Sequence, residues 1–459
     1  MLREVFMIRT VERKQLEKLY RQKGRRSVLL YGGSRSEVTS LVREFIKDKP
    51  SFYYMGRNAS EKEQLFQLQR ETEAFTSLPA EGTYEKCFSA VFSSFPSQGE
   101  DPVIVIDGFD AAVRHNLSFL DALKSLAAGR LCAGSFLLVL CVHSLTFVRS
   151  DPMKLFGENR FFDTTLRAED DSFLDLVRAF PEYSVRDAVS VYGVIGGVPA
   201  YVSLWEKNQT VRENICRLIL TPGGALFSEA EAYIGSELRE PAVYETILAS
   251  IARGNEKLND LFEDTGFSRA KISVYLKNLS AFNVTEKAVS FETGGWKNTK
   301  KGVYRIAEPF LAFWFTFVYP HLSERSILTS EEFYDRFIAP EIEDYLSGSF
   351  VRVCMEYLKL LNMVGQLPIR AKRFGSWYGK NGTIDLIGED ETRRRVVGIC
   401  SWNEEKMPYE SYEKLLLSMK EARIRADVVY LFSAHQFDDR ITSLSKEDSS
   451  VILVDMTEL

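Results

Sequence analysis

The chain has few of the residues that build metal sites and disulfide frameworks. Only four histidines occur in 459 residues, and none is paired with another at helical spacing, so we do not expect a zinc site. The six cysteines are scattered without any CxxC spacing. That pattern favours reduced thiols over a disulfide framework and predicts a cytoplasmic protein.

The sequence also lacks an excess of positive charge and a long apolar run. Its net charge of −6 argues against a uniformly basic nucleic-acid-binding surface, but a local basic patch is compatible with it because a patch acts within a Debye length. The longest apolar runs, near residues 131–142 and 310–320, are too short to span a bilayer. The first residues are charged and include no apolar segment, so we expect no secretion signal and no membrane partner.

A strand, a glycine turn and a helix open the chain. Residues Ser27–Tyr31 form a short apolar run that ends at Gly32 and Gly33, and residues Thr39–Lys47 have a helical apolar pattern. This order is the setting of a phosphate-binding loop, whose backbone N–H groups point at an anion. Two further apolar runs predict a parallel α/β sheet with functional groups at the carboxyl ends of its strands. They are Val103–Asp110 and Phe136–Val142.

These motifs resemble the archaeal-type predicted ATPases, a branch of the AAA-like P-loop NTPases. Aligned on Gly32, the family's G-x-x-x-x-G-K-T loop places Thr39 at the position that coordinates Mg²⁺. Asp107 matches the acid of the second motif, and Ser144 stands where the family places a polar sensor residue. The resemblance implies ATP with Mg²⁺ as cofactor. The candidate nucleotide-binding residues are Gly32, Gly33, Arg35 and Thr39, and the metal candidates are Thr39 and Asp107.

The chain departs from the family at three positions of this site. Val38 replaces the phosphate-binding lysine, Glu37 replaces the second glycine, and Gly108 replaces the water-activating glutamate. A carboxylate 4 Å from a phosphate charge is repelled by about 4 kcal/mol at an effective dielectric of 20. The loss of a general base removes rate at a separate step. We therefore expect impaired catalysis, unless Arg35 or Arg160 supplies the missing cation.

The middle of the chain is predicted to hold a helical lid over residues 171–240 and a winged helix over residues 241–310. A G-G-V-P run at residues 196–199 resembles the signature that joins two lid helices in the family. In DNA-binding winged helices the third helix enters the major groove and the wing contacts phosphates. The candidate DNA contacts are Arg269, Lys271, Lys277, Lys297, Lys300 and Lys301. The alternative is a packing module that does not contact DNA.

Residues 311–333 are rich in aromatic side chains and are predicted to be a core or interdomain segment, although base stacking is an alternative. Residues 334–459 resemble the PD-(D/E)XK nuclease-like domain of the same family. Asp385 matches the first acid of that site, but Ile399 and Ser401 replace the second acid and the lysine. Glu356 is a candidate second metal ligand. Nothing supplies the lysine, so we expect no cleavage.

Basic residues of the tail form a candidate phosphate-facing surface, with an ordinary solvated strand edge as the alternative. They are Arg370, Lys372, Arg373, Lys380 and Arg393–Arg395.

The predicted fold is therefore α/β: a P-loop parallel-sheet core over residues 1–170, then the lid, the winged helix, the aromatic linker and the small α/β domain. The leading functional hypothesis is a catalytically impaired, nucleotide-sensing or structural adaptor of this ATPase family that contacts DNA or a protein partner. The alternatives are a slow ATPase that uses Arg35, Thr39 and Asp107, and a winged-helix DNA-binding module on a P-loop scaffold.

Overall fold

The chain divides into two compact units in this computed structural model. One comprises residues 1–170 with 198–200, and the other comprises residues 171–197 with 201–459. The structure describes residues 10–32, 35–79, 82–96, 99–114, 116–132, 134–144, 147–148, 161–168, 170–237, 240–291, 302–379, 382–456 and 459, without the side chains of residues 10, 11, 35–37, 236 and 237.

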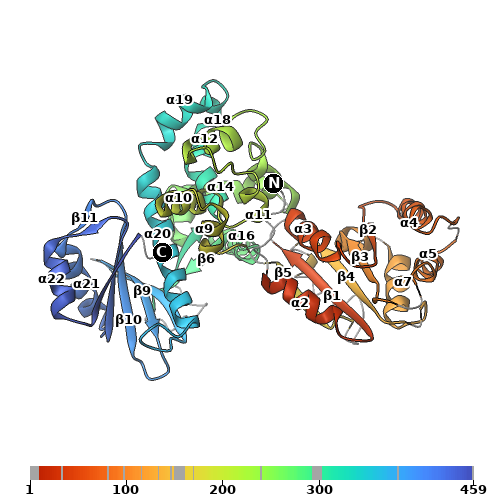
Figure 1. The fold of residues 1–459 in the computed structure, drawn as a ribbon. Coiled ribbons are helices and arrows are strands. Elements are labelled where there is room, and N and C mark those ends of the chain that lie inside the picture. The colour runs from red at the N-terminus through yellow and green to blue at the C-terminus, as the bar shows by residue number, and fades with distance from the viewer. Residues whose placement is uncertain are drawn as a thin grey trace. The chain divides into compact units, whose positions relative to one another are not determined.

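The first unit is built on a five-stranded parallel sheet (Figure 1). In spatial order its strands are β2 (Ser51–Met55), β3 (Val103–Asp107), β4 (Phe136–Val142), β1 (Arg25–Gly32) and β5 (Thr164–Ala168). Every residue of β3 and β4 is buried, as expected for parallel strands covered on both faces. The carboxyl ends of the strands lie along one edge of the sheet, here called the carboxyl edge, and their starts form the amino edge.

Helices cover both faces of this sheet. They are α2 (Thr10–Tyr20), α3 (Arg35–Ile46), α4 (Glu61–Thr76), α5 (Tyr84–Ser93), α6 (Phe109–Val113) and α7 (Leu117–Ala127). Side chains alternate along a strand, so Leu29 joins the core formed with α4, α5 and α7, whereas Val28 and Leu30 join the core beneath α3. The predicted α/β class with a parallel sheet in the first unit is confirmed.

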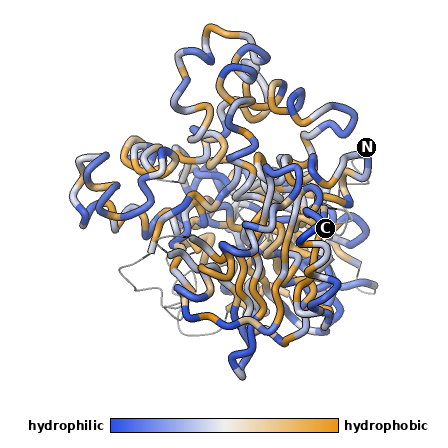
Figure 2. The backbone as a smooth tube through the Cα atoms, turned by 90° about the vertical axis from the view of Figure 1, so that its left-hand side faces the viewer, coloured by the Kyte–Doolittle hydropathy of each residue, from blue (hydrophilic) through white to orange (hydrophobic). Residues whose placement is uncertain are grey.

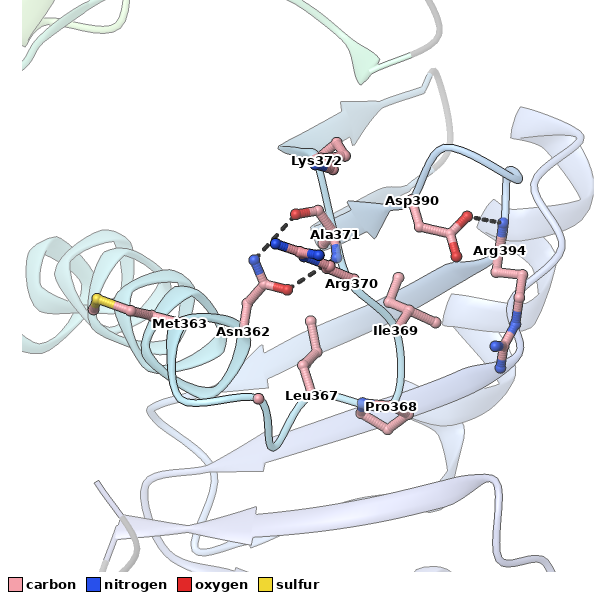
Figure 3. Close-up of a pocket in the computed structure, with 11 residues that line it drawn as sticks. Asn362, Met363, Leu367, Pro368, Ile369, Arg370, Ala371, Lys372, Asp390 and Arg394 are labelled. Carbon is pink, nitrogen blue, oxygen red and sulfur yellow. Dashed lines mark hydrogen bonds between the residues drawn. The ribbon is translucent and has the colours of Figure 1, made fainter.

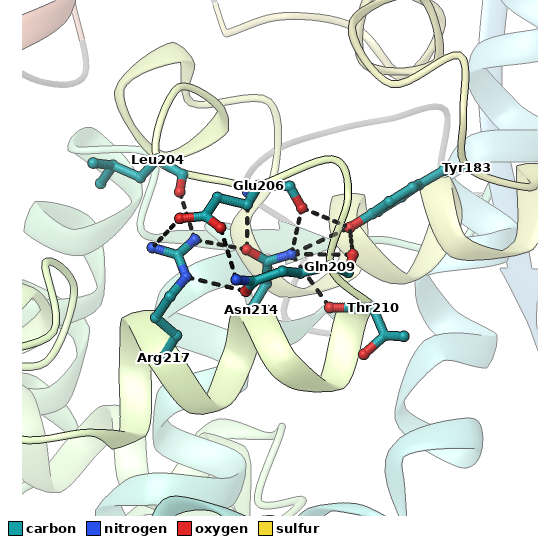
Figure 4. A network of polar contacts seen from close by, with 7 residues as sticks. All are labelled: Tyr183, Leu204, Glu206, Gln209, Thr210, Asn214 and Arg217. Carbon is teal, nitrogen blue, oxygen red and sulfur yellow. Dashed lines mark hydrogen bonds and ion pairs between the residues drawn. The ribbon is translucent and has the colours of Figure 1, made fainter.

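The second unit begins with short helices, and a polar network centred on the buried Asn214 surrounds the start of one of them, α12 (Val211–Ile215). The others are α9 (Phe173–Ala179), α10 (Val185–Ile195), α11 (Pro199–Val202, whose first two residues belong to the first unit), a π-helix (Cys216–Leu220) and α13 (Glu229–Glu237). Asn214, fully buried at the centre of the network, accepts from the backbone N–H of Glu206 at 2.9 Å and from Arg217 at 2.7 Å (Figure 4). Its amide donates to the carbonyl oxygens of Glu206 at 2.8 Å and Thr210 at 3.2 Å. The network fixes the start of α12 to the loop before it.

Three helices and a two-stranded antiparallel sheet follow. The elements are α14 (Pro241–Ala252), α15 (Leu258–Thr265), α16 (Arg269–Ala281), β6 (Thr285–Ala288) and β7 (Val303–Ile306). Ser268 caps α16 by accepting a hydrogen bond from the backbone N–H of Lys271, which satisfies one of the free donors of the first turn.

The aromatic segment is core. It folds as α17 (Pro309–Phe313), a π-helix (Trp314–Val318) and a 3₁₀ turn (Tyr319–His321). Phe313, Trp314 and Phe317 are each at most 2% exposed, so their rings are not available to stack on bases. Short helices α18 (Leu322–Arg325) and α19 (Ser330–Phe333) follow.

The chain ends in a mixed five-stranded sheet. In spatial order its strands are β14 (Val451–Asp455), β12 (Val428–Ser433), β10 (Arg395–Ser401), β9 (Thr383–Glu389) and β8 (Arg373–Tyr378). Helix α20 (Ile342–Met363) packs on one face, and α21 (Tyr409–Ala422) and α22 (Asp439–Glu447) lie on the other (Figure 1). Short strands β11 (Lys406–Met407) and β13 (Gln436–Phe437) pair beside it. The strands of the sheets are largely hydrophobic in Figure 2.

The helical stretch that follows the aromatic segment is divided into two parts. A π-helix over Tyr334–Ile338 precedes α20, which begins only at Ile342. In the part of the chain that the structure describes, no helix combines the length and hydrophobicity needed to cross a bilayer.

Candidate functional site

Asp107 lies at the carboxyl edge of the first sheet and is bonded to three side chains. It is the last residue of β3 and is fully buried. Thr39 of α3 donates to Oδ2 over 2.8 Å, and the hydroxyl of Tyr53 in β2 donates to the same oxygen. Nε2 of His143, which follows β4, lies 2.5 Å from Oδ1. Both carboxylate oxygens are therefore engaged by protein donors.

The electrostatics of this cluster favour an ionised Asp107. Burial alone would raise the pKa of Asp107, but hydrogen bonds from His143, Tyr53 and Thr39 outweigh burial and hold that pKa below its usual value. Burial and the bond to Asp107 together raise the pKa of Tyr53, which therefore stays a donor. Because Nε2 of His143 faces a carboxylate, that nitrogen carries the proton. Its Nδ1 is buried without a hydrogen-bond partner among the described residues.

Gly108, the position of the family's glutamate, is an unfavourable place for a side chain. Its φ is +75°, and a Cβ there would lie 3.0 Å from the carbonyl oxygen of Gly56. A Cβ on Gly56 would in turn lie 2.4 Å from the carbonyl oxygen of Gly108. The backbone segments around Gly56 and Gly108 are therefore in contact at the carboxyl edge. A glutamate at position 108 would crowd this contact and would adopt an unfavourable positive φ.

Val38, at the position of the family's lysine, points into the core. It is fully buried and packs in the cluster that contains Leu30, Leu41 and Val42. Helix α3 begins at Arg35, four residues before the helical segment expected from the sequence, so only residues 33 and 34 separate it from β1. Gly32 is the buried last residue of β1.

Several of the residues predicted for this site are not among those that the structure describes. Gly33 and Arg160 are outside the described residues, as are the side chains of Arg35 and Glu37. Ser144 does not bond to Asp107 in any described contact; its hydroxyl accepts from the backbone N–H of Phe147 at 3.3 Å. His143 and Tyr53 take part instead, and neither was selected from the sequence.

The residues at the carboxyl edge do not fit Mg-ATP hydrolysis. Thr39 and Asp107 carry the oxygen ligands that Mg²⁺ prefers. The hydroxyl of Thr39, however, donates its hydrogen bond to Asp107. An apolar side chain stands in place of the phosphate-binding cation, and a glycine stands in place of the base. We therefore derive no hydrolytic step for this site.

The candidate DNA-contacting side chains of α16 differ in their contacts with the rest of the protein. Arg269 donates from Nε to Asn259 over 2.8 Å and lies over the ring of Phe262. Lys271 lies over the ring of Phe267, with 4.6 Å between its Nζ and the ring centroid. Lys277 is exposed on the same helix. Lys297, Lys300 and Lys301 lie outside the described residues.

Asp385 lies in β9, where protein groups engage its carboxylate. It accepts from the backbone N–H of Cys400 at 2.9 Å and from the hydroxyl of Thr383 at 3.1 Å. Burial raises the pKa of Asp385 despite these bonds. Within the described residues, no group of three or more His, Cys, Asp or Glu side chains is arranged to hold a metal ion.

Glu356, the candidate second metal ligand, is engaged by other segments of the chain. Its two carboxylate oxygens accept from the backbone N–H of Phe173 at 3.1 Å and from the hydroxyl of Tyr192 at 2.6 Å. Glu356 therefore joins α20 to α9 and α10. The sequence placed it on the right helix but could not give the direction in which it points.

The basic residues of the tail partly surround a cavity of about 660 Å³ at the end of α20 (Figure 3). Arg370, Lys372 and Arg394 line it, together with Asp390. Lys372 is paired with Glu391 at 3.4 Å, and Arg394 with Asp427 at 3.3 Å. Asn362 holds the cavity's loop through two bonds with the backbone of Ala371. Lys380 lies outside the described residues.

The remaining basic side chains of this surface differ in how they are engaged. Arg373 and Arg395 both pair with Glu389, at 3.9 and 2.6 Å. Arg393 is exposed.

Comparison with known proteins finds distant similarity along most of the chain. Residues 314–421 match DUF234, a family described as "Archaea bacterial proteins of unknown function". An uncharacterized protein of Methanocaldococcus jannaschii is 24% identical over 409 residues, which is 88% of each chain. Among solved structures, a Walker-type ATPase of Pyrococcus abyssi is 15% identical with a TM-score of 0.47, covering 67% of this chain and 95% of that one. The Aeropyrum pernix ORC2 protein, solved as ADPNP–ADP complexes, is 12% identical with a TM-score of 0.45, covering 68% and 92%.

Proposed function

We propose that this protein is a catalytically silent relative of P-loop ATPases that works as a binding or adaptor protein. The observation that carries the proposal is the buried carboxylate of Asp107, which protein donors engage on both oxygens. In a working site this acid binds the metal-nucleotide complex, whereas here it joins α3, β2 and the end of β4.

Slow ATP hydrolysis through Arg35, Thr39 and Asp107 is the competing hypothesis. For Mg²⁺ to bind, Thr39 has to leave Asp107 and the buried carboxylate has to exchange its donors for the ion. Even then, no carboxylate at position 108 orients the attacking water. The catalytically silent protein is favoured over the slow ATPase because these two obstacles act on separate steps, metal binding and water activation.

The test measures Mg-ATP binding by calorimetry and phosphate release by the full chain. We expect no release above the background of a matched preparation of the Asp107→Asn variant, and no stabilisation by millimolar Mg-ATP that Asp107→Asn removes. Hydrolysis by the native chain that disappears in Asp107→Asn would sink the proposal and support the slow ATPase.

Duplex DNA binding by the three-helix segment is the second candidate function, with the winged-helix interpretation as its structural basis. The observation that favours it is the outward face of α16, where Ala270, Ser273 and Val274 are exposed between Arg269 and Lys277. Val274 is 57% exposed. Small and apolar side chains flanked by cations suit contact with base edges and phosphates in a major groove.

Fluorescence anisotropy on a duplex oligonucleotide across a salt series tests this second function. We expect Lys277→Glu to weaken binding and to reduce the slope of log K against log salt by about 1. The control is Lys414→Glu, which reverses one exposed charge on α21. Equal loss in both variants, or binding without salt dependence, would contradict a specific role for α16.

A further inference from the structure

The amino edge of the parallel sheet carries a cavity of about 400 Å³. It is formed by the starts of β1 and β4, the end of α7 and the residues just before β5. Asp107, in contrast, stands at the carboxyl edge. The cavity is therefore separate from the site discussed above, and nothing in the proposed function uses it.

Four cationic side chains line this cavity against one carboxylate. The cations are Arg25, Arg26, Lys124 and Arg130, and the acid is Asp163. These described lining residues sum to a formal charge of +3, because four positive charges oppose one negative charge. The whole chain carries −6, so this concentration of positive charge runs against the overall balance. Like charges gathered in a concave site raise the local concentration of anions.

Two of the four cations have no carboxylate partner in the described part of the chain. Arg26 pairs with Asp163 at 3.3 Å, and Lys124 pairs with Asp121 at 3.3 Å. Arg25 donates to the carbonyl oxygen of Cys132 at 3.2 Å and also contacts the thiol of Cys132, and Arg130 has no ion pair among the described residues. A carbonyl leaves most of the five donors of a guanidinium group available.

A glycine makes room for Arg25 at the cavity. Gly129 has φ +72°, and a Cβ on it would lie 1.9 Å from the guanidinium carbon of Arg25. The arginine head therefore occupies the space that a side chain at position 129 would fill. This contact holds the guanidinium group beside the end of α7 and reduces the ordering cost of binding an anion.

The rest of the cavity wall is apolar apart from Ser27. Phe136 and Leu138 are buried beneath it, and Phe161 is partly exposed. A concave site with convergent cations and an aromatic wall suits a small ligand that joins phosphate to a planar or apolar group. Its volume lies in the range of about 300–1,000 Å³ typical of small-molecule sites. A duplex backbone, by comparison, is met by an open stripe of charge rather than a cavity.

We propose that this cavity binds a small phosphate-bearing ligand of nucleotide size. Arg25 and Arg130 bind the phosphate, Arg26 and Lys124 contribute positive potential, and Phe161 contacts the planar group. The proposal does not depend on whether the carboxyl edge is silent, because the two sites share no residue.

Calorimetric titration of the full chain with inorganic pyrophosphate and with ADP, without Mg²⁺, tests the proposal. We expect both probes to bind, ADP more tightly because only ADP reaches the aromatic wall. Arg25→Gln/Arg130→Gln should weaken the binding of both by at least tenfold. The matched control, Lys62→Gln/Arg70→Gln, removes two exposed positive charges from α4 and should leave both affinities within twofold of native.

Three outcomes would overturn the assignment: no binding of either probe at millimolar concentration, ADP binding that survives Arg25→Gln/Arg130→Gln, or equal weakening in the control. Tighter binding of a 16-base-pair duplex than of ADP, lost in the same variant, would also overturn it in favour of nucleic acid. If the double variant melts early, Arg130→Gln alone repeats the test at an exposed position, where we expect at least threefold weaker pyrophosphate binding. Unchanged pyrophosphate affinity in that single variant would then overturn the assignment.

Discussion

Gly56 and Gly108 face each other across the carboxyl edge so closely that a Cβ on Gly56 would lie 2.4 Å from the carbonyl oxygen of Gly108. The backbone N–H of Gly56 also donates to the carbonyl oxygen of Asp107 over 2.6 Å. The segment after β2 is thereby fastened to the segment after β3, next to the buried carboxylate. The Gly56–Gly108 contact and the hydrogen bonds to Asp107 therefore connect β2, β3, α3 and the end of β4 at the same edge of the sheet.

Gly56→Ala should destabilise the first unit by about 1–3 kcal/mol, because the added methyl group meets backbone and the Cβ of Ala112 at 2.9 Å. Chemical denaturation followed by the circular dichroism of the chain measures the change. Gly134→Ala is the matched control, since a Cβ there meets nothing within 4 Å. A Gly56→Ala variant as stable as the control would show that the two segments move apart freely.

Val38→Lys should lower the melting temperature rather than restore nucleotide binding. The native valine is fully buried in an apolar cluster, and an unpaired ammonium group placed there costs several kcal/mol. Differential scanning calorimetry with and without Mg-ATP measures both effects. A variant that melts at the native temperature and gains more stability from Mg-ATP than the native chain does would show that the lysine reaches the carboxyl edge.

Asp107→Asn should destabilise the protein at neutral pH and have less effect in acid. Removing the charge leaves donors of Thr39, Tyr53 or His143 without their acceptor, at a cost of about 1–3 kcal/mol. Because the pKa of Asp107 is lowered in the folded state, its contribution is present above the unfolded pKa of about 3.9 and is lost as pH falls through the folded value. Unfolding free energies from pH 7 down to pH 3 should therefore converge; parallel curves would contradict the bond pattern.

Asp385→Asn should have the opposite pH dependence. Burial raises the pKa of Asp385, so the native chain gains stability as pH falls through that raised value toward about 3.9. The asparagine keeps an acceptor for the backbone N–H of Cys400 and carries no charge. We expect the variant to be at least as stable as native at pH 7 and to lose that advantage in acid. A clear loss of stability at pH 7 would show that the carboxylate is stabilising where it stands.

The sequence predicted the elements with strong patterns and missed those with weak ones. Strands β3 and β4 are continuous apolar runs and were expected. Strands β2 and β5 were not expected, because they are only five residues long and mix polar with apolar side chains. Edge strand β8 was missed for a similar reason.

These weak elements explain what was missed at the site. Tyr53 lies in β2. Because that strand was not predicted, there was no reason to place Tyr53 at the carboxyl edge. His143 directly follows β4, and the family pattern drew attention to its neighbour Ser144 instead. A polar residue at the carboxyl end of each strand was the available signal, and His143 satisfies it. Side-chain direction, as for Glu356, depends on packing between distant segments and is not encoded in local spacing.

The buried amide of Asn214 helps to select the position in which α12 docks during folding. Every donor and acceptor of this side chain is used by groups within the stretch from Tyr183 to Arg217. If α12 docked one turn out of place, the amide would be buried without those partners, and an unsatisfied buried amide is costly. The network thus penalises near-native alternatives more than it strengthens the native arrangement, and an apolar substitute of similar size would make the segment's docking ambiguous.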